Sequence, residues 1–267
     1  MDKKHPDEIR TVVRKKYGEV AKSDSSGCCT PVSSCCVESA TPLDNLGTLT
    51  GYSQEELSVA PEGSNMGLGC GNPQAIAALK PGETVLDLGS GGGFDCFLAA
   101  RQVGKTGQVI GVDMTADMIA KARENARKGD YSNVEFRLGE IEHVPVADAS
   151  VDVIISNCVI NLSPEKLDVF REVYRILKPG GRLAISDVVA TAPLPPELKN
   201  DLDLLSACVS GAATVVEITE MLQEAGFQDI QIQTRDESRE LIREWVPGKN
   251  VQDYIVSATI EAIKPQD

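Results

Sequence analysis

Three cysteines lie far apart in the chain, each in a segment with small or polar neighbours. Cys70 lies in GCGNP (69–73), Cys158 in SNCVINL (156–162) and Cys208 in CVSGA (208–212). Thiolates are soft ligands, so three of them brought together would hold a soft metal or metalloid. The alternative is core packing, because free cysteine is among the residue types most often buried. These segments predict a thiolate cage if the fold brings them to one place.

A glycine-rich loop, VLDLGSGGG (85–93), follows an apolar stretch and precedes a predicted helix. Glycines let the backbone turn tightly and present N–H groups to the polar end of a ligand. A dinucleotide site is the obvious rival interpretation, and a turn without any ligand is the other. The spacing is G-x-G-x-G, with Asp87 two residues before the first glycine. Asp113 ends the next predicted strand, where its carboxylate can accept hydrogen bonds from both hydroxyls of a ribose.

This region resembles the class I methyltransferases, also through the segment EVYRILKPGG (172–181). The resemblance implies S-adenosylmethionine as the cofactor and an adenine site at the end of the third strand, near Glu140. The implied cofactor-binding residues are Asp87, Gly89, Ser90, Gly91, Gly93, Asp113, Met114, Glu140, Ile141 and Asn157.

Hydrophobic periodicity predicts an α/β fold with a mostly parallel sheet, because strand and helix patterns alternate. Expected strands are 84–88, 108–113, 134–138, 151–156, 182–188, 228–234 and 254–263. Expected helices are 7–20, 94–103, 116–128, 164–177, 197–208, 214–226 and 236–244. Ligands of such sheets bind at the carboxyl ends of the strands, which is where Cys158 is expected.

Composition excludes several classes of function. The 267 residues carry a net charge of −14, which repels nucleic acid and anionic membranes. No apolar run approaches a membrane span, and the first residues do not predict a signal peptide. Eight cysteines are too few for a disulfide scaffold, so we expect reduced thiols and a cytoplasmic protein. A monomer is the default expectation.

The three cysteine segments resemble those of the arsenite methyltransferases, and the similarity runs from about residue 7 to residue 263. The resemblance implies a Rossmann-like class I fold in which Cys70, Cys158 and Cys208 are catalytic and hold As(III). The implied substrates are arsenite and methylated arsenicals. A thiol reductant, thioredoxin or glutathione, would serve as co-substrate and partner. Neither nucleic acid nor a membrane is an expected partner.

Four further cysteines, Cys28, Cys29, Cys35 and Cys36, form two vicinal pairs in a stretch with few large apolar residues. The family has an N-terminal cysteine implicated in redox or substrate delivery, and Cys28 matches it best by context. We favour an arm that captures arsenite, with a structural zinc site as the alternative. Cys96 lies among apolar residues of a predicted helix and is expected to be a core residue.

Three parts are expected. Residues 1–70 form an N-terminal helix and cysteine-rich arm, 71–190 the S-adenosylmethionine-binding domain, and 191–267 an arsenite-binding or capping region with closing strands.

Two other functions share some of these features. A methyltransferase of a small organic metabolite, such as a quinone precursor, would use the same donor motifs but leave the cysteines without a role. A non-catalytic metalloid-binding protein would use the cysteines but not the donor loop.

Overall fold

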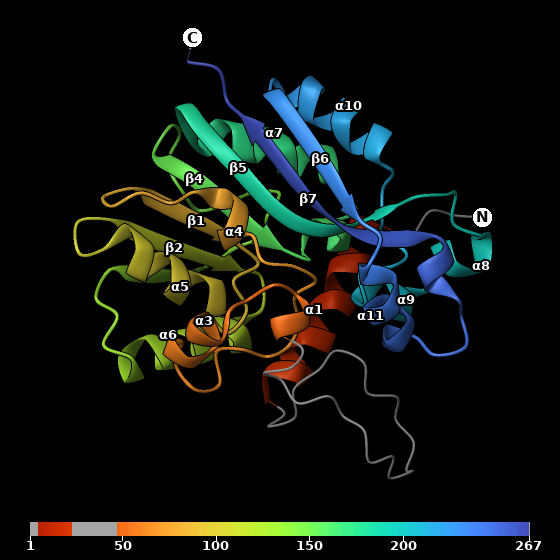
Figure 1. Cartoon of the computed structure of the whole chain (residues 1–267), viewed down its shortest axis with the longest axis horizontal. Coiled ribbons are helices and arrows are strands. Elements are labelled where there is room, and N and C mark those ends of the chain that lie inside the picture. Colours follow the sequence, from red (N-terminus) through yellow and green to blue (C-terminus); the bar gives the residue numbers. More distant parts are fainter. Residues whose placement is uncertain (1–4, 23–46, 267) are drawn as a thin grey trace.

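A seven-stranded sheet forms the centre of the computed structural model, which describes residues 5–22 and 47–266 (Figure 1). The strand order is β3-β2-β1-β4-β5-β7-β6. The strands are β1 (Thr84–Leu88), β2 (Gln108–Asp113), β3 (Val134–Leu138), β4 (Val151–Asn157), β5 (Leu177–Ala190), β6 (Gln228–Arg235) and β7 (Ile255–Ile263). The first five pair in parallel, and β7 runs antiparallel to both of its neighbours. This is the predicted Rossmann-like α/β fold.

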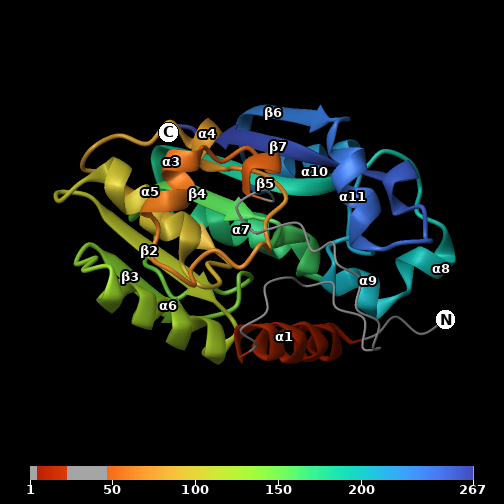
Figure 2. The ribbon, with the colours of Figure 1, turned by 60° about the horizontal axis from the view of Figure 1, so that its bottom comes forward.

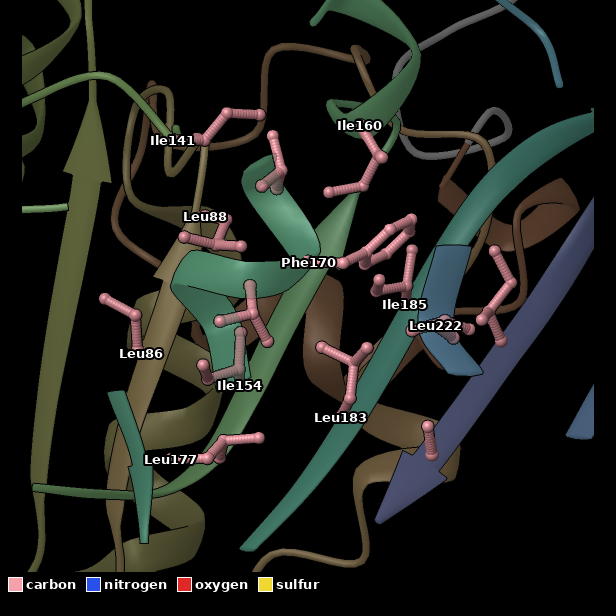
Figure 3. Close-up of a cluster of buried hydrophobic side chains, with 14 of the residues drawn as sticks. Leu86, Leu88, Ile141, Ile154, Ile160, Phe170, Leu177, Leu183, Ile185 and Leu222 are labelled. Atoms are coloured by element: carbon pink, nitrogen blue, oxygen red, sulfur yellow. The ribbon is translucent and has the colours of Figure 1, made fainter. Parts of the chain in front are cut away.

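Helices cover both faces of the sheet because alternate residues of each strand point to opposite sides. On one face, Leu86 and Ile154 pack with Phe170 of α7 (Lys166–Ile176) and Leu222 of α10 (Val215–Ala225), as Figure 3 shows. On the other face, the side chains of β1 and β4 meet α5 (Phe94–Val103) and α6 (Ala116–Lys128). Helix α4 (Gln74–Ala77) packs beside β5.

Helix α1 (Pro6–Lys22) contacts α6 and α9, and Figure 2 shows it along the lower edge of the molecule. Helix α3 (Gln54–Val59) is short, and Ser53 is its N-cap. The Ser53 side chain accepts from Glu56 N, and the Ser53 backbone N–H donates to the Glu56 side chain. Helix α11 (Ser238–Trp245) packs against β7. None of the helices in residues 5–22 and 47–266 combines the length and apolarity of a membrane span.

The prediction of one helix over 197–208 was wrong. The structure has two short helices there, α8 (Pro196–Lys199) and α9 (Leu202–Ser206). The break occurs because the Asp201 carboxylate accepts hydrogen bonds from the N–H groups of Asp203 and Leu204 and begins a new helix. Cys208 therefore follows α9 in a turn and has a positive φ of 60°.

Candidate active site

The carboxyl ends of β1, β2 and β4 open on a cavity with about 1180 Å³ of empty space, open solvent included. Eight of the ten residues predicted to bind a cofactor line this cavity: Asp87, Gly89, Ser90, Gly91, Asp113, Met114, Ile141 and Asn157. Cys158 lines it as well. The cavity lies at the edge of the sheet where ligands of parallel α/β folds bind.

The glycine loop is held tightly against its neighbours. The N–H groups of Gly89 and Ser90 donate to Val112 O at 2.7 and 2.9 Å. A Cβ on Gly89 would stand 2.3 Å from Val159, whereas one on Gly91 would meet no atom within 4 Å. Gly89 therefore serves close packing, and Gly91 leaves room for a ligand.

Two polar groups at this loop, Asp113 and Ser90, bear on the binding of S-adenosylmethionine. The Asp113 carboxylate accepts hydrogen bonds from Gly91 N at 3.1 Å and from Thr115 N at 2.8 Å, which fixes its direction. Burial raises the pKa of Asp113, and those backbone donors oppose the rise. The Ser90 hydroxyl is buried with no hydrogen-bond partner in the described structure. This oxygen is buried near Gly111 of β2 rather than exposed to the cavity, so the fit to the donor rests on Asp113.

Gly93 and Glu140 do not line the cavity. Gly93 begins α5 with a φ of 92°, and a Cβ there would stand 2.8 Å from atoms of the Phe97 and Phe136 rings. Glu140 forms ion pairs with Arg10 and Arg14 of α1 at 3.6 and 2.9 Å.

Helix α1 also forms part of the cavity wall through Arg10, Val13 and Tyr17. Arg10 is buried and pairs with Glu142 at 3.2 Å and, at shorter range, with Glu165. The sequence analysis did not identify these lining residues. Their only sequence signal was the apolar face of the helix, which indicated burial but not the surface it would cover.

Thiols from two distant segments meet beside this cavity. The Sγ atoms of Cys70 and Cys158 and a carboxylate oxygen of Asp187 all lie within 4.8 Å of one another. Cys208 lies on the other side of Cys158, with its Sγ donating to Cys158 O at 2.9 Å. All three cysteines are at most 4% exposed. Asp187, which the sequence analysis did not identify, follows from no motif in the chain.

The three thiols are held in their protonated forms. Burial raises the pKa of Cys70 to about 11. For Cys208, the hydrogen bond with Cys158 and then burial raise the pKa well above its ordinary value. For Cys158, the hydrogen bond with Cys208 lowers the pKa, but the one with Cys70 and burial together outweigh it. An electrophile at this site therefore meets thiols and must release their protons.

Asn157 fixes the segment that carries Cys70. Its Oδ1 accepts from Cys70 N at 3.1 Å, and its Nδ2 donates to Gly71 O at 2.8 Å. A Cβ on Gly69 would stand 2.6 Å from the Asn157 amide. The glycine before Cys70 thus permits the close approach that these two hydrogen bonds require.

Asn161 fixes the other side of the thiol cluster. Its Nδ2 donates to Asp187 Oδ1 at 2.8 Å and to Val188 O at 2.6 Å. A Cβ on Gly211 would stand only 1.9 Å from Asn161 O, so the turn after Cys208 packs directly on this backbone. The two asparagines of SNCVINL therefore position residues on either side of Cys158.

Two of the three cysteines have a strained backbone conformation. Cys158 and Cys208 have φ values of 59° and 60°, in the left-handed region that side chains other than glycine disfavour. Each such residue costs about 1–2 kcal/mol, and such conformations cluster at functional sites. The surrounding contacts of Asn157 and Asn161 offset this cost locally.

The remaining cysteines differ in setting. Cys96 lies in α5, is fully buried in the core and donates from Sγ to Asp87 Oδ2 at 3.2 Å, in keeping with the core position expected of it. Cys28, Cys29, Cys35 and Cys36 lie outside the described residues.

The chain is similar to known proteins of one family. Residues 79–226 match the model of a methyltransferase domain. An arsenite methyltransferase of Halobacterium salinarum is 54% identical, over 97% of this chain and 68% of that protein. Another, from Aquipseudomonas alcaligenes, is 42% identical over 81% of this chain and 61% of that protein. This chain thus spans about two thirds of the length of these relatives.

Solved structures agree with the fold. An arsenic(III) S-adenosylmethionine methyltransferase from Chlamydomonas reinhardtii has a TM-score of 0.63 and 33% identity, over 85% of this chain and 75% of that one. A phosphoethanolamine N-methyltransferase from Haemonchus contortus shares the fold, with a TM-score of 0.61 and 23% identity over 86% of this chain and 62% of that one. Since a relative at 54% identity spans nearly the whole chain, the protein belongs to the arsenite methyltransferase family of S-adenosylmethionine-dependent class I methyltransferases.

Proposed function

We propose that this protein transfers the methyl group of S-adenosylmethionine to trivalent arsenic held by the thiolates of Cys70, Cys158 and Cys208. The observation that carries the proposal is the thiol cluster beside the donor cavity. Cys158 lines that cavity, and the Sγ of Cys70 lies within 4.8 Å of the Sγ of Cys158. The Sγ of Cys208 donates to Cys158 O. A methyltransferase of an oxygen or carbon substrate would have no use for three converging thiols.

Arsenite binding accounts for the protonated thiols. As(OH)3 reacts with three thiols to form three As–S bonds and three water molecules. Each thiol proton leaves with one hydroxide of arsenite, so the raised pKa values of these cysteines are no obstacle. Three sulfur ligands leave the arsenic lone pair free.

The chain's role in methyl transfer is then to position the reactants. S-adenosylmethionine supplies an electrophilic methyl group on a sulfonium. The arsenic lone pair carries no proton, so no general base is needed, and orientation is the main requirement. We assign Asp113 to the ribose hydroxyls, Ile141 to the adenine end, and Gly89, Ser90 and Gly91 to the methionine end.

Methylation oxidises arsenic to the pentavalent state, so each cycle requires two electrons. Two enzyme thiols can supply them by forming a disulfide, which thioredoxin or glutathione would reduce. We propose that Cys28, Cys29, Cys35 and Cys36 act in arsenite capture or in this redox step, with a zinc site as the alternative. Residues 1–70 and 191–267 would thus deliver substrate to the donor domain, 71–190, in the reducing cytoplasm.

Single-turnover methylation of arsenite tests the proposal. Purified protein is incubated with arsenite, S-adenosylmethionine and a thiol reductant, and methylated arsenic is measured. Serine has nearly the size of cysteine but is a hard ligand, so Cys158→Ser and Cys208→Ser should lose methylation while retaining fold and donor binding. Cys96→Ser controls for the change of a buried cysteine outside the cluster, and its donor affinity is measured as well because Cys96 Sγ donates to Asp87.

Full activity in either cluster variant would contradict the three-thiolate mechanism. Methylation of a demethylated quinone but not of arsenite would favour an organic substrate. Arsenite binding without any turnover in the wild-type protein would favour a metalloid-binding protein.

A further inference from the structure

We infer that the Asp187 carboxylate stabilises the positive charge that develops on arsenic during methyl transfer. This inference rests on the proposed function. It assigns a catalytic role to a residue that comes from β5 and belongs to none of the cysteine segments.

The position of Asp187 relative to the thiols is the first ground. Its carboxylate lies within 4.8 Å of the Sγ atoms of both Cys70 and Cys158 and is 2% exposed. Arsenic bound to these sulfurs, at bonds near the Zn–S length of about 2.3 Å, would lie within a few ångströms of the carboxylate. Asp187 does not line the donor cavity, whereas Cys158 does. The carboxylate therefore lies outside the cavity lining, next to the two thiols.

The movement of charge in the reaction is the second ground. The arsenic lone pair forms the As–C bond, and the electron pair of the breaking C–S bond stays on the donor sulfur. The donor becomes neutral, arsenic becomes cationic, and no proton moves. Positive charge therefore passes from the cavity to the thiols, toward Asp187. A fixed negative charge in a buried site lowers the energy of such a transition state.

Hydrogen bonds fix the position of the Asp187 carboxylate before the reaction begins. Asn161 Nδ2 and Val188 N both donate to its Oδ1 at 2.8 Å. Hydrogen bonds from these two donors favour the ionised form of the carboxylate. Lys166 is the cation that lowers the pKa of Asp187 through its charge, but its Nζ donates to Ser163 O, and it forms no ion pair with Asp187 among the described residues. The charge of Asp187 is thus available to arsenic.

The test compares Asp187→Asn, which keeps the shape and the Oδ1 acceptor, with wild-type protein. Asp130→Asn, a neutralised exposed acid at the end of α6, is the matched control, and Asp187→Ser is a second neutral variant. We expect arsenite affinity by calorimetry to stay within about threefold, because all three cysteine thiols remain. We expect single-turnover methyl transfer to slow by roughly 10- to 100-fold.

A second readout is independent of turnover. Cationic and anionic methanethiosulfonate reagents modify thiols at rates that depend on local potential, and mass spectrometry of peptides can follow Cys158 alone. The ratio of cationic to anionic rates should fall by several-fold, about 3- to 10-fold, in Asp187→Asn, and should be unchanged in Asp130→Asn.

The outcomes separate the two proposals. Wild-type transfer rates in both neutral variants, or an unchanged reagent ratio, would overturn the role of Asp187. Loss of arsenite affinity in Asp187→Asn would also overturn it, since the carboxylate would then be an arsenic ligand. If wild-type protein methylates no arsenite, the proposed function fails, and an altered reagent ratio would support only the charge at the thiols.

Discussion

Replacing Gly211 with alanine adds one methyl group, which should push the turn after Cys208 away from the backbone of Asn161. The site requires the turn after Cys208 to pack on the backbone of Asn161, and Gly211 permits this. An alanine Cβ at residue 211 would stand 1.9 Å from Asn161 O, against a favourable separation of about 3.5 Å. The two segments would have to part by about 3.5 − 1.9 = 1.6 Å. The φ of Gly211 is not among the positive values, so the effect is steric rather than conformational.

Such a displacement moves Cys208 relative to Cys158. Misplacement of about 1 Å typically costs about 100-fold in rate, so Gly211→Ala should reduce arsenite methylation by at least that factor. Overpacking should lower the free energy of unfolding by about 1–3 kcal/mol. Donor binding should be nearly unchanged, because Gly211 does not line the cavity. Single-turnover methylation, calorimetry with the donor and urea unfolding measure these three effects.

Gly104→Ala is the matched control. Gly104 ends α5 with a φ of 67°, and a Cβ there meets no atom within 4 Å. This variant should lose about 1–3 kcal/mol of stability through backbone strain while retaining activity. If Gly211→Ala methylates arsenite within twofold of the wild-type rate, the packing of the Cys208 turn on Asn161 does not set the position of the thiol.

Two further predictions concern carboxylates. Asp113→Ala should weaken donor binding by about 1.5–3 kcal/mol, the range for hydrogen bonds to a charged group, and leave arsenite binding unchanged; equal donor affinity by calorimetry would refute the ribose assignment. Asp187→Asn should change how stability depends on pH. Because burial raises the pKa of Asp187 to about 6 from 3.8, the folded protein keeps a proton that the unfolded chain has released, so wild-type stability falls as pH rises through this window. Asp187→Asn has no carboxylate to titrate, so it lacks this loss. Its free energy of unfolding, relative to that of wild type, should rise by about 2 kcal/mol between pH 4.5 and pH 7.5. If urea unfolding shows the same difference between the two proteins at both pH values, the pKa of Asp187 is not raised.

Much of the fold was predictable because its signals are local. The strands at 84–88, 108–113 and 134–138 and the helices at 94–103 and 116–128 match the predicted bounds. Strand alternation and helical periodicity report burial directly, and Gly104 and Gly129 end their helices as expected. The helix predicted over 197–208 failed because one side chain, Asp201, began a new helix within an otherwise helical pattern.

The sequence alone located the glycine-rich loop that we assign to the donor and the three cysteine segments, since glycine spacing and the seven-residue segment SNCVINL are readable without a fold. Only the tertiary structure decided which residues share a site. It brought Asp187 against Cys70 and Cys158, left Gly93 and Glu140 outside the cavity lining, and placed Arg10 of α1 in the cavity wall. These are contacts between residues far apart in sequence. They depend on the order in which strands pair and on close backbone approaches such as Gly211 on Asn161, which no local pattern encodes.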